Sequence, residues 1–442
     1  MNAAPRWTRT FYRILAAEVS AITRYYDRVT HLQTQENESN DLLPLVDCPE
    51  KASAQTPAGV PDASGERDRR SAVLLNGAFN YSFDIQAILQ ALRPRLSRTS
   101  RVIAVTYNAY YKWLFLLLAK CGLTRSKEFT TFVTLNDLRQ LATISGYELV
   151  RLRGACYFPF ALLGLGTLLN KLLPALPVLR WFSIASVCVL RPRLPSAVKP
   201  SLSVIIPARN EAGNIERALA EMPVMPGVDT EIVFVEGHSK DDTWAKIQEV
   251  VKRGHPVFKL AAYQQAGRGK NDAVRLGFSK ASNEVLTILD ADLTMPPEML
   301  PRFYQAYVDG LADFVNGSRL VYPMEGEAMR FLNLLANVFF AKALSSTLGM
   351  RIGDSLCGTK LVAAHDYRRI TRWRGDFGDF DPFGDFELLF PAAVLGLGCV
   401  DIPVRYKART YGSTNIHRFR HGLILLKMTL TGWLRIRLGR TG

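Results

Sequence analysis

Between residues 202 and 320 the chain alternates short apolar runs with amphipathic segments. The apolar runs have the length and composition of buried strands: LSVIIPA, TEIVFVEG, VFKLAAY, EVLTILDAD and DFVNGSRL. The segments between them have helical patterns: EAGNIERALAEM, DTWAKIQEVVKRG, KNDAVRLGFSKA and PPEMLPRFYQAYVDG. This alternation predicts an α/β fold with a doubly wound sheet, whose ligands bind beyond the carboxyl ends of the strands.

A second α/β pattern precedes the first one. The runs SAVLLNG and SRVIAVTYN flank a helix from Asp84 to Pro94, and strand and helix patterns continue to residue 191. A length of 442 residues exceeds what one hydrophobic core usually serves, and three prolines mark a boundary within 191–202. Residues 33–70 are polar and aperiodic, which predicts a linker or disordered loop. The predicted parts are 1–70 (N-terminal helix and linker), 71–191, 199–416 and a tail, 417–442.

Polar residues stand where the predicted strands end. The first strand ends at Pro207, and Asn210 and Glu211 follow it, either as a helix cap or as ligand groups. Glu236 ends the second strand before a glycine and is the favoured ligand group there. The DDT sequence that begins at Asp241 is better suited to capping the next helix.

Residues 266–277, AGRGKNDAVRLG, place two glycines and a lysine before a predicted helix. Glycine lets the backbone approach a phosphate, and a helix N-terminus attracts anions. The glycine and lysine spacing of a P-loop is absent. The segment therefore indicates phosphate binding only together with the other strand ends.

Two carboxylates, Asp290 and Asp292, end the strand VLTIL. Carboxylates separated by one residue at a strand exit can both turn toward one hard cation, and Mg²⁺ or Mn²⁺ is commonly held by one or two carboxylates plus substrate phosphates. A polar turn that closes the strand is the alternative. The position beside three other polar strand ends favours a metal site.

The net charge of +15, from 55 basic and 40 acidic residues, favours an anionic partner. No acidic residue follows Asp401, and the tail combines lysines and arginines with leucines, which is typical of a segment lying on an anionic membrane. A solvated basic helix with one packed face is the alternative. No motif of a nucleic-acid-reading module is present, so nucleic acid is not an expected partner.

Cysteine usage and hydropathy bear on the compartment. Six scattered cysteines without a CxxC pair suit a reducing cytosol and neither a disulfide framework nor a zinc site. The N-terminus lacks a signal-peptide core, and the apolar run 157–170 is shorter than the ~20 residues that span a bilayer. Residues 329–350 are either a buried helix or a lipid-facing surface. The expected location is cytoplasmic, peripherally associated with the inner face of the cytoplasmic membrane.

Eight segments occur in order across residues 201–416: SVIIPARNE, VEGHSKDD, GRGKNDAVRLG, LDADL, NGSRL, DSLCGTK, GDFELLF and IPVRYKARTYGSTN. This ordered set resembles the family-two glycosyltransferases with a GT-A-type fold. Within them it is most similar to the dolichyl- and polyprenyl-phosphate sugar synthases. The resemblance covers a little over half of the chain.

The resemblance implies a role for each matching position. The nucleotide-sugar would contact Pro207, Ala208, Asn210, Glu211, Glu236, Asp272, Arg275 and Ala291. The acceptor phosphate would meet Lys360, Arg405, Arg409 and Ser413. The catalytic residues would be Asp292, Asp385 and Arg319, with Asp385 positioning the acceptor. A Mg²⁺ or Mn²⁺ ion would bind Asp290 and Asp292.

Two positions depart from the family pattern. Asn415 stands near the usual lysine of an R-x-x-G-x-S-K motif, which puts one charge on the acceptor phosphate in doubt. Thr294 stands where glutamine often follows the second aspartate, although a hydroxyl can also ligate a hard cation. Cys357 is expected to be a small packed residue rather than a nucleophile.

Residues 71–191 resemble the carboxyl half of a SAM-dependent methyltransferase domain, through AVLLNGAFNYSFDIQAILQALRPRLSRTSRVIAVTYN. The glycine-rich turn that binds the cofactor in that family belongs to the first half. No glycine precedes Gly59 here. The resemblance thus predicts a degenerate domain that acts as a scaffold and does not bind SAM.

Three functions remain open from the sequence. The leading one is metal-dependent, inverting sugar transfer from a nucleotide-sugar, of the GDP-mannose or UDP-hexose type, to polyprenyl or dolichyl phosphate. The second is transfer onto a growing polysaccharide or lipid-linked glycan, which would require a true base at Asp385. The third is a non-catalytic membrane scaffold.

Overall fold

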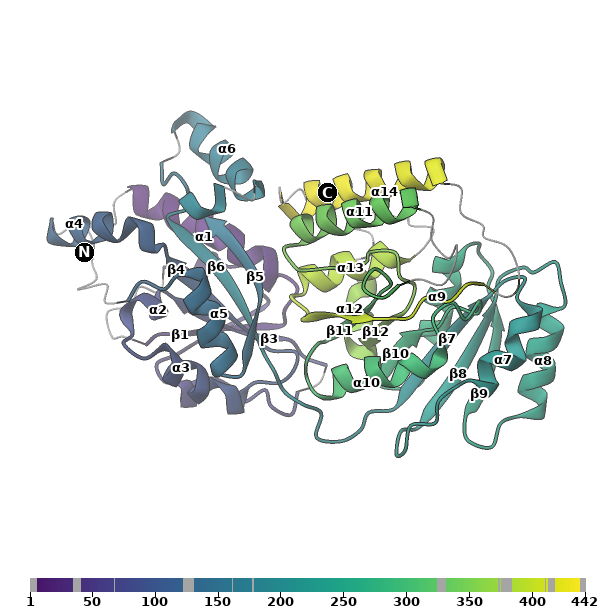
Figure 1. The fold of residues 1–442 in the computed structure, drawn as a ribbon. Helices are drawn as coiled ribbons and strands as arrows, with labels where there is room; N and C mark the ends of the chain where they lie inside the picture. The colour runs from purple at the N-terminus through teal and green to yellow at the C-terminus, as the bar shows by residue number, and fades with distance from the viewer. Residues whose placement is uncertain are drawn as a thin grey trace. The chain divides into compact units, whose positions relative to one another are not determined.

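The computed structural model describes residues 6–34, 41–66, 68–121, 131–160, 162–176, 179–323, 331–372, 374, 384–409, 411 and 418–437. The chain divides into two compact units (Figure 1). The first unit holds Met1–Leu194 with Val394–Leu397 and Ile436–Arg440. The second unit holds Pro195–Ala393 with Gly398–Arg435 and the last two residues.

The first unit is built on a six-stranded sheet. Its strands are β1 (Arg28–Leu32), β2 (Glu50–Ala54), β3 (Ser71–Asn76), β4 (Arg101–Tyr107), β5 (Tyr147–Ala155) and β6 (Ala185–Pro192), in the order β2-β1-β3-β4-β6-β5. Strands β1 to β4 pair in parallel, whereas β6 runs antiparallel to both of its neighbours. The helices are α1 (Arg6–Thr23), α2 (Ala78–Tyr81), α3 (Ile85–Leu92), α4 (Lys112–Lys120), α5 (Leu135–Ile144) and α6 (Leu165–Leu172).

The prediction of a linker or disordered loop over residues 33–70 is wrong, because part of this segment belongs to the sheet. Strand β2 pairs in parallel with β1, and Leu42 and Val46 are buried before it. The sequence of β2, EKASA, buries only Ala54, because an edge strand is held by backbone hydrogen bonds rather than by an apolar face. The sheet therefore begins at Arg28, well before the predicted start of this part at residue 71.

The second unit is built on a seven-stranded sheet of order β13-β11-β12-β10-β7-β8-β9. Its strands are β7 (Leu202–Ala208), β8 (Thr230–Glu236), β9 (Lys259–Gln264), β10 (Val285–Ile288), β11 (Phe314–Ser318), β12 (Lys360–Ala363) and β13 (Cys399–Pro403). Strands β10, β7, β8 and β9 run parallel, and β12 runs antiparallel between β10 and β11. The predicted α/β class is confirmed by these two mainly parallel sheets.

The helices of the second unit follow its strands in alternation. They are α7 (Ile215–Ala220), α8 (Thr243–Arg253), α9 (Lys270–Lys280), α10 (Leu300–Val308), α11 (Phe331–Leu348), α12 (Ala364–Arg372), α13 (Asp385–Val394) and α14 (Arg418–Gly432). A π-helical turn, Trp433–Arg437, continues α14. Helices α11 and α14 pack against each other (Figure 1).

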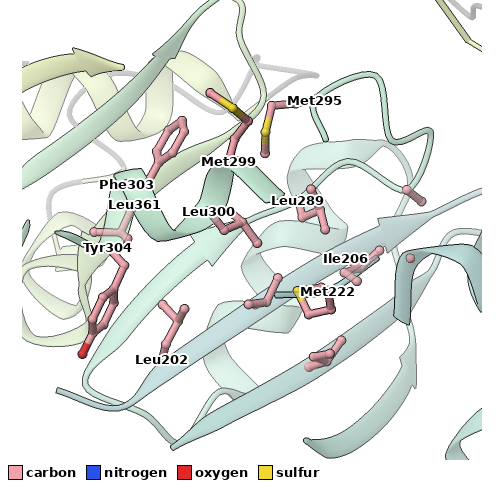
Figure 2. Close-up of a cluster of buried hydrophobic side chains, with 14 of the residues drawn as sticks. Leu202, Ile206, Met222, Leu289, Met295, Met299, Leu300, Phe303, Tyr304 and Leu361 are labelled. Atoms are coloured by element: carbon pink, nitrogen blue, oxygen red, sulfur yellow. The ribbon is translucent and has the colours of Figure 1, made fainter. Parts of the chain in front are cut away.

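The hydrophobic core of the second unit positions the carboxyl ends of its parallel strands. Strand β7 is buried along nearly its whole length, as expected of a parallel strand covered on both faces. Leu202 and Ile206 of β7 pack in one cluster with Leu289, Leu300 and Phe303 (Figure 2). On α9, a Cβ at Gly277 would lie 2.4 Å from Ile205, so glycine permits the close approach of helix to sheet. These contacts hold the ends of β7, β8 and β10 together.

Candidate functional site

The carboxyl ends of four parallel strands meet at one edge of the second unit's sheet. The register pairs Ala208 with Glu236 and Glu236 with Gln264. On the other side of β7, Ile288 pairs with Ile205, and Asp290 follows two residues later. The polar clusters expected at strand ends therefore lie along a single edge, here called the carboxyl edge.

A tight turn after β7 joins the first two clusters. Asn210 has a left-handed φ of +57°, its backbone N–H donates to Ser239 Oγ (3.0 Å), and its Oδ1 accepts from the Lys240 N–H (2.8 Å). Asp241 accepts hydrogen bonds from the Thr243 N–H (3.1 Å) and the Ala212 N–H (3.3 Å). The loops after β7 and β8 thus form one hydrogen-bonded surface, and Asp241 caps backbone groups of both.

Glu211 is buried at this surface. Its backbone N–H donates to Thr243 Oγ1 (2.9 Å), and its Oε2 accepts from Asn214 Nδ2 (2.7 Å). Burial raises the pKa of Glu211 to about 7, with the amide of Asn214 and the guanidinium of Arg409 acting in the opposite direction. The Glu211 side chain makes no capping hydrogen bond to the helical turn that follows it, Ala212–Asn214.

Glu236 is buried at the end of β8. Its carboxylate accepts from the Ser239 N–H (2.5 Å) and from Gln264 Nε2 (3.1 Å). Burial acts to raise the pKa of Glu236, but these hydrogen bonds outweigh it, and the pKa lies below its usual value. Glu236 is thus an ionised acceptor, oriented by two neighbouring strand ends.

Asp290 and Asp292 flank a buried alanine. Ala291 is 3% exposed and belongs to the hydrophobic core, whereas the carboxylates on either side of it pair with cationic side chains. Lys270, at the start of α9, forms an ion pair with Asp290. Arg409 Nη2 lies 2.5 Å from Asp292 Oδ2, and Arg409 Nη1 lies 3.5 Å from Glu211 Oε1. Arg409 therefore joins the second carboxylate to the loop after β7.

Thr294 orients Asp292. Its hydroxyl donates to Asp292 Oδ1 over 2.8 Å, and its backbone N–H donates to the same oxygen over 3.1 Å. The carbonyl of Thr294 accepts from the Lys407 N–H (2.9 Å), which fixes the segment after β13 beside this loop. The threonine that departs from the family pattern thus acts on Asp292 through hydrogen bonds.

Further cations lie near Asp290. Burial acts to raise the pKa of Asp290, but the positive charges of Lys270, Lys360 and Arg319 hold it below its usual value. Lys360 is buried on β12 and bonds to Asp385 and to the Cys357 carbonyl. Three cationic side chains therefore act on the first carboxylate, and two of them, Lys360 and Arg319, are also paired with Asp385 and Asp354.

Arg319 and Arg275 are both held by acidic side chains. Arg319 Nε lies 2.7 Å from Asp354 Oδ2 and Nη2 lies 2.9 Å from Oδ1, while its guanidinium stacks on Tyr406. Arg275 Nε lies 2.9 Å from Glu387 Oε2. The same carboxylate binds Asn271 and Arg374. These pairs orient both arginines within the protein.

The remaining predicted residues have simpler surroundings. Pro207 and Ala208 end β7, and the Ala208 carbonyl accepts from the Gly237 N–H (2.9 Å). Asp272 accepts from the Gly267 N–H (3.0 Å) and closes the glycine-rich loop. Arg405 is exposed after β13. Ser413 and Asn415 lie outside the described residues. Cys357 is buried, and burial raises the pKa of its thiol to about 11, so it is a packed residue as expected.

The partners of several residues in the quoted segments were not predicted. Lys270, Asp354 and Glu387 pair with side chains from other parts of the chain. Ser239 and Gln264 were not predicted as part of the site. Ser239 follows the end of β8 and Gln264 ends β9, and this position is the signal that points to them.

The donor set fits a hard divalent cation. Asp290 and Asp292 supply carboxylate oxygens at the same strand exit, and such ions complete their shell with water and substrate phosphate. In the described part of the chain no group of three or more His, Cys, Asp or Glu side chains is arranged to hold a metal. A metal at Asp290 and Asp292 would thus share its coordination with a ligand.

Among the described residues, no helix combines the length and the apolar character that crossing a bilayer requires.

Comparison with known proteins shows what this region is similar to. Residues 203–362 match the model of glycosyl transferase family 2. Dolichol-phosphate mannosyltransferase of Pyrococcus furiosus is 38% identical over 121 residues, which are 27% of this chain and 33% of the relative. Dolichyl-phosphate hexose transferase of Haloferax volcanii is 28% identical over 237 residues, which are 54% of this chain and 96% of the relative. The chain thus spans a third of the first relative and nearly all of the second.

Solved structures give a weaker likeness. Glucosyl-3-phosphoglycerate synthase of Mycobacterium tuberculosis, in complex with Mn²⁺, UDP and glucosyl-3-phosphoglycerate, aligns with a TM-score of 0.38 and 17% identity, over 54% of this chain and 80% of that chain. The matched residues run from the second residue of β7 to the third residue of β12 and include Glu211, Glu236, Asp290 and Asp292. The region that holds the carboxyl edge is therefore similar to the glycosyl transferase family 2 model.

Proposed function

We propose that this protein transfers a sugar from a nucleotide-sugar to polyprenyl or dolichyl phosphate, with a divalent cation and with inversion at the anomeric carbon. The observation that carries the proposal is the pairing of both carboxylates, Asp290 and Asp292, with cations at the carboxyl edge. The two relatives named above, which act on dolichyl phosphate by name, support the acceptor class.

The diphosphate of the donor fits the electrostatics around Asp290. Lys270, Lys360 and Arg319 lower the pKa of this carboxyl, so their combined positive potential extends over it. When a divalent ion is bound, it neutralises charge on the leaving nucleoside diphosphate. The chain's own part is to keep Asp290 ionised, to orient Asp292, and to place cationic side chains around the leaving phosphates.

The base and ribose of the donor fit the loops after β7 and β8. Glu236 is an ionised acceptor suited to hydroxyl or amino donors, and Asn210 is fixed in the turn beside it. Glu211 extends this surface toward Arg409. These groups recognise hydrogen-bond donors by geometry, so they orient the nucleotide before the sugar reacts.

A lipid phosphate is already ionised at neutral pH and needs no strong base. One of its oxygens attacks the anomeric carbon, the bond from that carbon to the donor phosphate breaks, and the nucleoside diphosphate leaves with the electron pair. A single displacement of this kind inverts the anomeric configuration. The ion pair of Asp385 with buried Lys360 supports a positioning role for Asp385, because the lysine holds this carboxylate in one place.

Apolar surface on α11 and α14 supports a peripheral position at the cytoplasmic membrane face. Leu425 and Met428 of α14 are buried, whereas Leu423, Leu426 and Leu430 are exposed. Leu335 and Phe339 of α11 are also exposed. Together with the basic tail, an exposed apolar face is suited to an anionic bilayer, where the lipid acceptor resides.

The first unit is proposed to be a scaffold that does not bind SAM. Titration calorimetry of the full chain with SAM checks this, because micromolar binding would overturn it.

The transfer proposal is tested by supplying the purified chain with polyprenyl phosphate and a panel of labelled nucleotide-sugars, with and without EDTA. Lipid-soluble label that depends on one nucleotide-sugar and on a divalent ion is the expected result. Asp292→Asn is expected to lower it by about 100-fold or more. The scaffold alternative predicts that the wild type binds no nucleotide-sugar. Under the glycan alternative, Asp385→Asn abolishes turnover instead of weakening acceptor binding.

A further inference from the structure

The first unit exposes large apolar side chains on two helical segments. On α4 and the turn before it, Tyr110, Trp113 and Leu117 are 65%, 64% and 51% exposed. On α6 and the turn before it, Leu163 is fully exposed, and Leu165 and Leu168 are 54% and 52% exposed. We call these six residues the α4–α6 surface.

Both segments leave the sheet at the same end. The register pairs Tyr107, at the end of β4, with Ala185, and it pairs Ala155, at the end of β5, with the same Ala185. The α4 segment follows Tyr107 and the α6 segment follows Ala155, so both extend beyond one end of the sheet. Figure 1 shows α6 beyond the ends of β5 and β6. Tyr111 of the first segment also donates through its hydroxyl to the Phe182 carbonyl (2.9 Å), which follows α6.

The outward direction of the leucines is set by polar contacts on the inner face of α6. The buried residues of this helix are Gly166 and Asn170, not its leucines. Asn170 Oδ1 accepts from the Tyr157 N–H (2.6 Å) and the Phe158 N–H (3.0 Å), and its Nδ2 donates to the Phe158 carbonyl (2.6 Å). A Cβ at Gly166 would lie 1.8 Å from the Phe160 carbonyl oxygen. Turning the leucines inward would break these bonds and place bulk where only glycine fits.

The two segments carry basic residues and no acidic ones. No acidic residue occurs between Asp84 and Glu128 or between Glu148 and Glu211. Lys112, Lys120 and Lys171 are exposed on α4 and α6. An apolar face with lysines and without carboxylates complements anionic headgroups above an acyl layer, and Trp113 and Tyr110 are the residue types enriched at that boundary.

We propose that the α4–α6 surface docks the first unit on an anionic lipid bilayer, with its leucines inserted among the acyl chains. The proposal concerns a different surface from the C-terminal helix, and it does not rest on the proposed sugar transfer. It assigns the first unit a role in membrane attachment.

The test compares full-length variants in vesicle sedimentation. The double variant Leu163→Glu with Leu168→Glu places carboxylates on the α4–α6 surface, and neither substituted residue is buried. The matched control is Leu45→Glu with Ile144→Glu, because these side chains are 47% and 60% exposed and precede β2 and β5 at the opposite end of the same sheet. The vesicles are phosphatidylcholine alone and phosphatidylcholine with about 30 mol% phosphatidylglycerol.

The first double variant is expected to lower the partition coefficient on anionic vesicles by about tenfold or more, while the control pair keeps wild-type binding. Wild-type binding by the first double variant, or an equal loss in the control pair, overturns the proposal. The proposal is also overturned if light scattering shows a dimer for the wild type and a monomer for the first double variant while vesicle binding is unchanged. A second copy of the chain would then cover the α4–α6 surface.

A second readout uses the wild-type fold. Brominated lipids are expected to quench part of the tryptophan fluorescence of the wild type. The quenched part is expected to be missing in Trp113→Phe. Equal quenching of the wild type and Trp113→Phe would place Trp113 outside the bilayer and contradict the proposal.

Discussion

Arg409 binds Asp292 from 117 positions further along the chain, with Nη2 2.5 Å from Oδ2. The same guanidinium lies 3.5 Å from Glu211, so it bridges the loops after β7 and β10. If the proposed function holds, a divalent ion at Asp292 would compete with this guanidinium for the carboxylate. The proposal therefore predicts that Arg409 moves from Asp292 to an anionic ligand when metal and donor phosphates bind.

Arg409→Ala is accordingly expected to strengthen binding of Mn²⁺ in the absence of nucleotide by about 3- to 10-fold, because the competing charge is gone. It is expected to slow sugar transfer, because the same charge is then missing from the phosphates. Electron paramagnetic resonance of free Mn²⁺ measures the first effect. Arg405→Ala, an exposed arginine of the same segment, is the control, and equal Mn²⁺ affinity in both variants and the wild type would exclude competition at Asp292.

Thr294→Val removes the hydroxyl that donates to Asp292 and leaves the backbone bond to the same oxygen. Groups that orient a metal ligand typically affect metal affinity and activity by about 10-fold or more. We expect a lower kcat/KM and a higher Mn²⁺ requirement, with Thr294→Ser restoring both. If Thr294→Val matched the wild type at limiting Mn²⁺, the hydroxyl would have no orienting role.

Glu211 has a folded-state pKa of about 7, above its ordinary value, because burial disfavours the charged form. The folded chain therefore holds a proton that the unfolded chain has released, and this stabilisation is fully present below the unfolded pKa and lost as pH rises through about 7. Between pH 5 and pH 8 the wild type is expected to lose about 2 kcal/mol relative to Glu211→Gln in chemical unfolding. The exposed Glu249→Gln serves as control and is expected to show no comparable trend. Parallel pH curves for the wild type and Glu211→Gln would contradict the raised pKa.

Lys360→Met leaves Asp385 buried without its cation, since the two side chains are 1% and 8% exposed. Removing one partner of a buried pair typically costs about 3–5 kcal/mol. Urea unfolding is expected to show a loss of this size, whereas Lys259→Met, in an exposed pair, is expected to show no comparable loss. The double variant with Asp385→Leu is expected to recover part of the loss. A single-variant loss no larger than that of Lys259→Met would mean that Asp385 and Lys360 are not coupled.

The fold class was predictable in the second unit because its strands are continuous apolar runs between amphipathic helices. Strand β7 and the loop with Asp290 and Asp292 lie where the pattern placed them. Strand β2 could not be predicted in this way, because its sequence, EKASA, buries one residue and depends on backbone pairing with β1.

The partners of the charged residues were not predictable. Lys360 was expected near the acceptor phosphate and Arg275 near the nucleotide-sugar, and the sequence did not predict that the folded chain pairs them with Asp385 and Glu387. Lys360 and Asp385 are 25 residues apart in the chain, and Arg275 and Glu387 are 112 residues apart. Side-chain type and spacing along one strand contain no information about which helix packs beside it.

By itself, the sequence determined the α/β class of the second unit, the polar strand ends and the position of the two aspartates. These follow from local patterns, since a strand's periodicity and its terminating residues are read within a few positions. Only the tertiary structure decided that Lys270 and Arg409 hold Asp290 and Asp292, that Thr294 orients the second aspartate, and that the leucines of α6 face outward. These relations depend on distances between segments far apart in the chain, which are set by the packing of the sheets and helices.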